Sequence, residues 1–255
     1  MIEESFSIKD SQGGLIPGIF CRPDQNAVGG AVLCHGFLSS SESKTNLALT
    51  QFLLAKGFAT VRFDFFGHGK SKEEFAQMTL SRCVDQLERV LAWFKTKRIR
   101  RVGIVGSSFG GLVALLVSEN HPELRTVALK CPVSDYTSIW RGQLGEAGMQ
   151  YWESSGLTSI VNGDGSRARL GYGFYQDLLQ YDGYAAAGKI EVPVLIVHGD
   201  RDAYVPIPQS ERLRDFLPGE KRLEKIPGAD HEFSRVEDFE KMTGLIGDWL
   251  VEKLR

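Results

Sequence analysis

Residues 106–110 of this chain read Gly-Ser-Ser-Phe-Gly, and this segment indicates a nucleophile more clearly than any other part of the sequence. A β-branched stretch, 102–105, precedes it and an apolar stretch, 112–117, follows it, which predicts a tight turn between a strand and a helix. In that context the pattern G-x-S-x-G is typical of a nucleophilic serine, Ser108, held near the positive end of a helix dipole. Glycines two residues before and after Ser108 have a steric reason, because side chains there would collide with neighbouring backbone. Ser107 receives no chemical role.

A serine hydroxyl is a weak nucleophile, so the chemistry also requires a base and a carboxylate that orients the base. Asp200 and Asp202 follow the apolar stretch 192–197, where carboxylates would lie at the edge of a sheet at which sites of open α/β folds gather. His231 lies in a loop just before the last predicted helix. The order serine, acid, histidine along the chain is the order used by serine hydrolases built on a strand-turn-helix nucleophile. We therefore expect Ser108 to be the nucleophile and His231 the base.

These motifs resemble those of the α/β-hydrolase superfamily, in particular its esterase and acyl-hydrolase branch, which includes the bacterial cinnamoyl and feruloyl esterases. The resemblance covers nearly the whole chain and weakens only in residues 134–184. The family's loop of the form HG-x-x-D-x-x-VP matches residues 198–206, which implies that Asp202 is the triad acid and that Asp200 shapes the loop. The family's terminal histidine corresponds to His231. Some members place the acid after the preceding strand, which leaves Asp135 as the alternative.

A further motif implies the groups that would stabilise an oxyanion. Residues 35–38, His-Gly-Phe-Leu, resemble the family's oxyanion-hole loop, so the backbone N–H of Phe37 would face the carbonyl oxygen together with that of Phe109. Residues 64–71 resemble the family's D-x-x-G-x-G-x-S turn. This segment ends in Gly-Lys-Ser but lacks the first glycine of a phosphate loop, so we expect a structural turn and no nucleotide binding. The remaining histidines are expected to be structural: His35, His68, His121 and His198.

The segments that must position these residues have the pattern of an α/β fold. Short apolar runs with the character of strands occur at 30–34, 59–63, 102–105, 126–130 and 192–197. Between and after them, apolar residues recur at helical spacing, as in 87–94 and 242–250. A turn-rich stretch at 10–14 predicts an antiparallel hairpin of 5–8 and 15–21 at one edge. We expect the α/β-hydrolase fold, a mostly parallel twisted sheet with helices on both faces.

The regular alternation stops after 126–130 and resumes only at 192–197, which is longer than a crossover connection requires. We expect residues 134–184 to form a cap (lid) insertion, and residues 1–133 and 185–255 to form the α/β-hydrolase core. The insertion is rich in aromatic residues and contains the polar turn Asn162-Gly163-Asp164-Gly165. Aromatic side chains commonly line substrate pockets, and the candidates for substrate binding are Tyr136, Trp140 and Tyr172.

Composition excludes several other classes of function. The 255 residues carry a formal net charge of −2 without a long run of lysine or arginine, so we expect no nucleic-acid partner. The acidic start lacks the features of a secretion signal and no apolar stretch could cross a bilayer, so we expect a cytoplasmic protein without a membrane partner. The four cysteines are scattered, which predicts neither a disulfide framework nor a metal site.

The function predicted from these features is that of a serine hydrolase. It would cleave a carboxylic ester of a small to medium, apolar or aromatic, acyl group through an acyl-enzyme, without a metal or an organic cofactor. The partner would be a small-molecule ester or thioester. An acyl thioesterase or a serine aminopeptidase-like amidase would use the same three residues, and a non-catalytic small-molecule binder on the same fold is the alternative from a different class.

Overall fold

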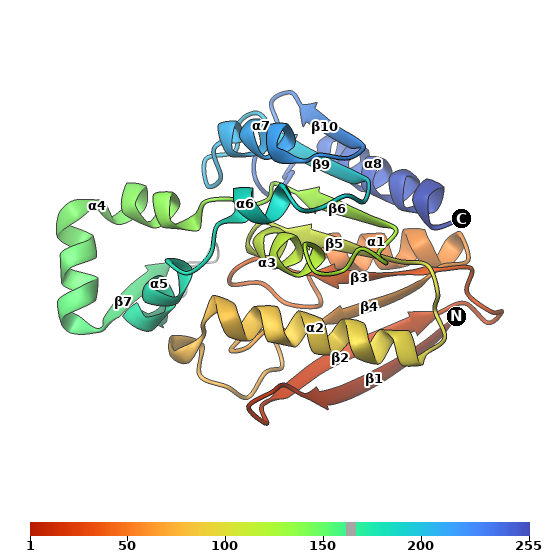
Figure 1. Ribbon diagram of the computed structural model, residues 1–255, viewed down its shortest axis with the longest axis horizontal. Helices are drawn as coiled ribbons and strands as arrows, with labels where there is room; N and C mark the ends of the chain where they lie inside the picture. Colours follow the sequence, from red (N-terminus) through yellow and green to blue (C-terminus); the bar gives the residue numbers. More distant parts are fainter. Residues whose placement is uncertain (162–166) are drawn as a thin grey trace.

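The computed structural model describes residues 1–161 and 167–255, so the predicted polar turn at Asn162-Gly163-Asp164-Gly165 lies outside the described residues. Its main feature is an eight-stranded sheet in the order β1-β2-β4-β3-β5-β6-β9-β10 (Figure 1). The strands are β1 (Ile2–Lys9), β2 (Leu15–Arg22), β3 (Gly30–Cys34), β4 (Ala59–Phe63), β5 (Val102–Ser107), β6 (Thr126–Lys130), β9 (Val194–Gly199) and β10 (Lys221–Ile226). The first two strands form an antiparallel hairpin that joins β4 antiparallel, and the strands from β4 to β10 are parallel.

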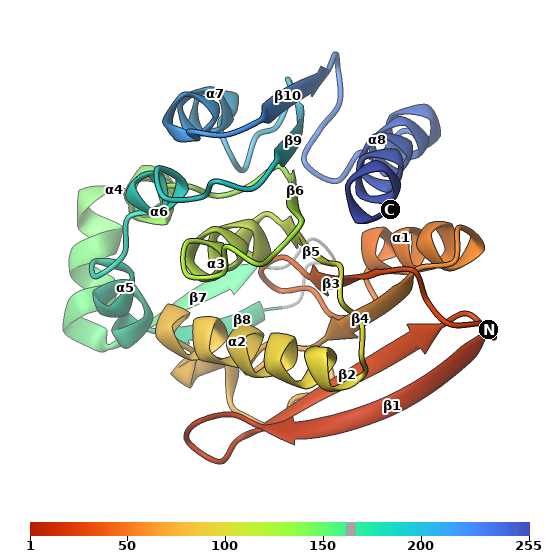
Figure 2. The ribbon, with the colours of Figure 1, turned by 45° about the vertical axis from the view of Figure 1, so that its right-hand side comes forward.

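Helices cover both faces of this sheet (Figure 2). One face carries α1 (Lys44–Ala55) and α8 (Val236–Leu254), and the other carries α2 (Leu80–Thr96) and α3 (Phe109–Ser118). The apolar stripe of α2 is buried as its spacing predicts, from Leu87 to Phe94. Strands β3, β4 and β6 are buried along their whole length, as expected for parallel strands covered on both sides. The predicted α/β-hydrolase fold is therefore confirmed.

The edge strand β10 is absent from the sequence prediction. Its sequence, Lys-Arg-Leu-Glu-Lys-Ile, is mostly charged and largely exposed, because one side of the strand has no neighbour in the sheet. Charged residues on edge strands are common because they oppose pairing with other chains, and they remove the apolar pattern by which a strand is recognised. A short helix, α7 (Ile207–Phe216), connects β9 to β10.

Between β6 and β9 the chain forms an insertion whose described elements are α4 (Tyr136–Ser155), β7 (Leu157–Val161), β8 (Arg167–Gly171), α5 (Tyr172–Leu178) and α6 (Gly183–Ala187). Helices α4 and α5 and strand β7 project beyond one end of the sheet, whereas α6 packs against α3 (Figure 1). Helix α4 bends at Gly145, whose φ of 63° is non-helical. The insertion is attached to the core through Asp177, which accepts hydrogen bonds from the N–H and the hydroxyl of Ser81 at 2.7 and 2.5 Å. The division of the chain into core and cap stays a prediction.

In the described part of the chain, no helix combines the length and the apolar character that crossing a membrane would require.

Candidate active site

Ser108 lies on the turn between β5 and α3, with a φ of 52° and a ψ of −116°, which is unusual for any residue other than glycine. The glycines around it are required by close backbone contacts. A Cβ at Gly106 would lie 2.5 Å from the carbonyl oxygen of Gly110, and a Cβ at Gly110 would lie 2.4 Å from that of His35. The turn is further held by the Ser108 N–H, which donates to the Lys130 carbonyl at 2.9 Å. The strained turn therefore depends on packing against the ends of neighbouring strands.

We predict that Gly110→Ala lowers the free energy of unfolding by about 3 kcal/mol, because the added methyl group meets rigid backbone that cannot move away. Gly244→Ala is the matched control. This glycine also lies within a helix, α8, but a Cβ there has nothing within 4 Å, so the substitution should be neutral or stabilising by up to about 1 kcal/mol. Urea denaturation of both variants would check this. Equal stability of the two variants would show that the turn tolerates a side chain at position 110.

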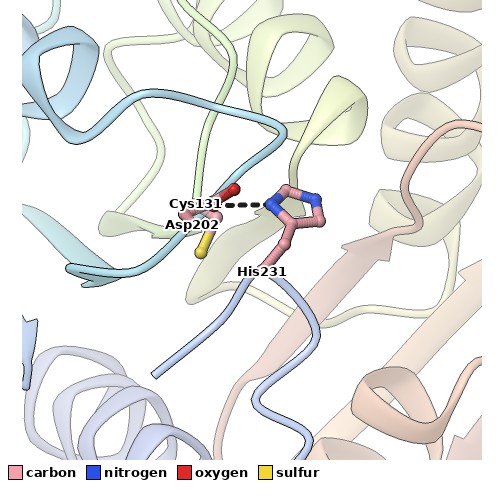
Figure 3. A group of neighbouring side chains, drawn as sticks. All are labelled: Cys131, Asp202 and His231. Carbon is pink, nitrogen blue, oxygen red and sulfur yellow. Dashed lines mark hydrogen bonds and ion pairs between the residues drawn. The ribbon is translucent and has the colours of Figure 1, made fainter. Parts of the chain in front are cut away.

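The structure brings Asp202 and His231 into direct contact (Figure 3). Asp202 lies in the loop after β9 and His231 in the loop before α8, and Nδ1 of His231 is 2.6 Å from Oδ2 of Asp202. The other carboxylate oxygen accepts the N–H groups of Tyr204 at 2.8 Å and Val205 at 2.9 Å. A carboxylate can only accept, so Nδ1 of His231 carries a proton, and in the neutral form of the ring Nε2 has the lone pair.

Asp202 is buried, and burial by itself would raise the pKa of its carboxyl group. Hydrogen bonds from His198 and His231, together with the charge of the imidazole and the Val205 N–H, outweigh burial and hold this pKa far below its usual range. Asp202 is therefore an anion at neutral pH. His198, which is expected from the sequence to be structural, has Nε2 3.1 Å from Oδ2 of Asp202. The four-residue separation of His198 and Asp202 in the loop motif is the signal that could have indicated this contact.

The other two aspartates considered as acids lie elsewhere. Asp135 caps the start of α4, where its carboxylate accepts the Ser138 N–H at 2.9 Å. Asp200 accepts the Gly228 N–H at 2.6 Å, which joins the two loops that carry Asp202 and His231. Of these three aspartates, only Asp202 is hydrogen-bonded to His231.

Ser108 and His231 line one cavity of about 350 Å³, which is in the range of small-molecule sites. The described side chains show no hydrogen bond between these two residues. Tyr136 and Trp140 of α4 also line the cavity. Several further residues line the cavity but have no role predicted from the sequence: Leu38, Ser39, Val133, Ile139, Gln143, Ile160, Val161, Tyr204, Val205 and Glu232. Val133, Ile139, Ile160 and Val161 are apolar and lie outside any motif, so the sequence offers no signal for them. Leu38, Tyr204 and Val205 lie within the motifs at 35–38 and 198–206.

Tyr172 is not among the described residues that line this cavity. It is the first residue of α5, and its ring packs against Trp152 and Tyr175 at centroid distances of 5.7 and 5.8 Å. It lines a separate cavity with Arg141 of α4. Trp140 lines the cavity of Ser108, whereas Tyr172 lines the second cavity. The two residues therefore belong to different surfaces of the insertion.

The predicted oxyanion loop lies against the turn of Ser108. A Cβ at Gly36 would be 3.4 Å from Cβ of Ser108, which is van der Waals contact and shows how close the loop lies to the turn. Phe37 follows, and its ring lies 5.8 Å from that of Phe109. Phe109 is the first residue of α3, where a backbone N–H has no acceptor within the helix. The Phe37 loop and the start of α3 therefore both lie next to Ser108.

Within the described ranges, one group of potential metal ligands has its donor atoms within 4.8 Å of one another: Cys131, Asp202 and His231 (Figure 3). Two of these residues are already hydrogen-bonded to each other, and Nδ1 of His231 would have to lose its proton to bind a metal ion. Burial raises the pKa of the Cys131 thiol well above its usual value, so the sulfur is protonated at neutral pH. The arrangement fits a hydrogen-bonded acid and base with a neutral thiol beside them. All four cysteines are free and buried.

Comparisons with known proteins agree with the fold. A family model described as the alpha/beta hydrolase family matches residues 31–241. Est1E from Butyrivibrio proteoclasticus, solved with ferulic acid bound, superposes with a TM-score of 0.85 at 23% identity and covers 98% of this chain and 99% of its own. Alpha/beta hydrolase domain-containing protein 10 from mouse has a TM-score of 0.82 at 20% identity, over 99% and 100%. A thermostable monoacylglycerol lipase from Bacillus sp. (strain H-257) is 26% identical over 71% of this chain and 74% of the lipase.

Proposed function

The chain belongs to the α/β hydrolase family, and from that premise we propose that it is a serine hydrolase that cleaves a carboxylic ester of a small to medium, apolar or aromatic acyl group. One observation carries the proposal. Ser108 and His231 line the same cavity, while His231 is hydrogen-bonded on its other side to the buried anion Asp202. A nucleophile, a base and an acid that orients the base are the parts that acyl transfer by serine requires.

In the proposed reaction, Ser108 Oγ attacks the ester carbonyl carbon while Nε2 of His231 takes the hydroxyl proton. The tetrahedral intermediate then collapses, the C–O bond to the alcohol breaks, and the imidazolium gives its proton to the departing alcohol oxygen. Water next attacks the acyl-enzyme, again giving a proton to His231, and the carboxylic acid leaves as Ser108 recovers its proton. Asp202 stabilises the imidazolium in both halves of the cycle, because it remains an anion against Nδ1.

The proposed oxyanion hole consists of the backbone N–H groups of Phe37 and Phe109. The close approach of Gly36 to Ser108 and the position of Phe109 at the start of α3 support this assignment. Such a donor typically lowers the barrier by about 3 kcal/mol. Because only the backbone is needed, the Phe37 ring is free to line the cavity.

The proposed acyl group follows from the walls of the cavity. Phe37, Tyr136 and Trp140 supply aromatic surface, and Ile139 and Ile160 supply aliphatic surface. Est1E was solved with an aromatic acid, ferulic acid, which is in keeping with an aromatic or apolar acyl group here. We also propose that residues 134–184 act as a cap, since α4 and β7 contribute residues to the cavity that contains Ser108.

A panel of substrates would test this proposal. We expect kcat/KM to be highest for aryl esters with apolar or aromatic acyl groups, and lower for matched acyl thioesters and aminoacyl amides. We also expect a fluorophosphonate probe to label Ser108, because covalent capture requires an activated serine. A clear preference for thioesters or amides would change the assigned bond. Folded protein that neither reacts with the probe nor turns over any substrate would favour a non-catalytic binder.

A further inference from the structure

The loop that carries Phe37 contains a strained residue. Leu38 has a φ of 56°, in the left-handed region that residues with a side chain seldom adopt, at a typical cost of about 1 kcal/mol or more. Such a conformation persists only where the surroundings hold it. The supporting contacts come from the turn 64–71, which follows β4 and has no part in the proposed reaction.

Two histidines join the loop and the turn reciprocally. His68 of the turn accepts the Leu38 N–H at its Nε2, at 3.1 Å. His35 of the loop accepts the Phe65 N–H at its own Nε2, also at 3.1 Å. The imidazole of each segment therefore accepts a hydrogen bond from a backbone N–H of the other segment. Neither segment can shift without breaking one of these hydrogen bonds.

The protonation state of His68 is fixed by its partners and its surroundings. Its Nδ1 donates to the Phe66 carbonyl at 2.9 Å, so the proton resides there and Nε2 has the lone pair that Leu38 requires. Burial, together with the nearby His35, lowers the pKa of His68 to about 3. The ring is therefore neutral at neutral pH, whereas an imidazolium could not accept the Leu38 N–H.

The His68 ring is also held in place by packing. Its centroid lies 5.0 Å from that of Phe75 and 6.0 Å from that of Phe37. The ring is 4% exposed and is not among the described residues that line the cavity of Ser108. His68 can therefore affect a substrate only through the loop that it supports.

We propose that His68 is a positioning residue for the oxyanion hole: by holding the Leu38 N–H it fixes the strained loop so that the adjacent Phe37 N–H faces the oxyanion beside Ser108. This inference rests on the proposed serine hydrolase function. An oxyanion donor contributes most when it is already oriented before charge develops, because no free energy is then spent on reorganisation during the reaction. Without His68, Leu38 could relax to an unstrained φ and turn the neighbouring peptide groups away.

The test compares His68→Phe, which keeps an aromatic ring but removes the acceptor, with His68→Gln, whose side-chain oxygen can still accept from Leu38. We expect His68→Phe to lower kcat for an aryl ester by between about 10- and 100-fold, with KM within about three-fold of wild type. His68→Gln should recover most of the loss. An aryl boronic acid forms a tetrahedral adduct with serine, so its inhibition constant should rise by the same factor as kcat/KM falls. The inhibition constant of the carboxylic acid product should not change.

Each rate is divided by the concentration of sites that react with the fluorophosphonate probe. A lower rate caused by partial unfolding is then not mistaken for impaired catalysis. His68→Asn, too short to reach Leu38, provides a second variant in case the phenylalanine variant does not fold, and it should show the same loss. His121→Gln, which changes a histidine bound to Glu88 and Glu123 outside the site, is the control. Wild-type kcat per site in folded His68→Phe or His68→Asn would overturn the inference alone. Wild-type protein without turnover or labelling would refute the proposed function and this inference together.

Discussion

Ser108→Ala is expected to reduce kcat for ester hydrolysis by about 10⁵- to 10⁶-fold, the scale of loss when a triad nucleophile is removed. Without the hydroxyl, no acyl-enzyme forms, and the residual rate comes only from binding and the oxyanion hole. The fold should persist, because alanine keeps the Cβ and the Ser108 N–H still donates to the Lys130 carbonyl. Steady-state kinetics on an aryl ester, with a thermal melt of each protein, would measure both effects.

Ser107→Ala is the matched control for this experiment. Ser107 is adjacent in sequence, and its buried hydroxyl has no hydrogen-bond partner in the described structure. Removing an unpartnered buried hydroxyl leaves no new unsatisfied group, so stability and turnover should both be retained. Retained hydrolysis by pure Ser108→Ala, or an equally large loss in Ser107→Ala, would assign the nucleophile to another residue.

Asp202→Asn is expected to lower kcat at neutral pH by about 10⁴-fold, as found for such a change in another Ser-His-Asp enzyme. The amide would present an N–H to Nδ1 of His231 and favour the tautomer with its proton on Nε2, which could not accept the Ser108 proton. Asp200→Asn is the control, because an amide oxygen can still accept the Gly228 N–H. If Asp135→Asn caused the large loss instead, the acid would be the residue at the start of α4.

The same substitution should change how stability depends on pH. The pKa of Asp202 is lower in the folded protein than its ordinary value of about 4 in an unfolded chain. The ionised carboxylate therefore stabilises the fold above that ordinary value, and this contribution is lost as the pH falls toward the folded pKa. We expect the difference in unfolding free energy between wild type and Asp202→Asn to be largest near neutral pH and to shrink below about pH 5. A difference that stays constant from pH 7 to pH 3 would contradict this.

Much of the fold could be predicted because its signals are local. The strands β3, β4 and β6 have continuous apolar runs, and the buried stripe of α2 has helical spacing. The turn at Ser108 is recognisable because steric exclusion by nearby backbone requires glycine at 106 and 110. The edge strand β10 could not be predicted in the same way, since its exposed side removes the apolar pattern.

The candidate site likewise has features that the sequence predicts and features that it does not. The order of the proposed nucleophile, acid and base, and the motifs in which they lie, can be read from the sequence alone. Only the tertiary structure decided that Asp202 rather than Asp135 contacts His231, that Tyr172 lies away from the cavity of Ser108, and that His68 holds Leu38. Backbone sterics and apolar periodicity act over a few residues along the chain. These contacts instead join residues about 30 or more positions apart, so they exist only once the strands and the insertion have packed.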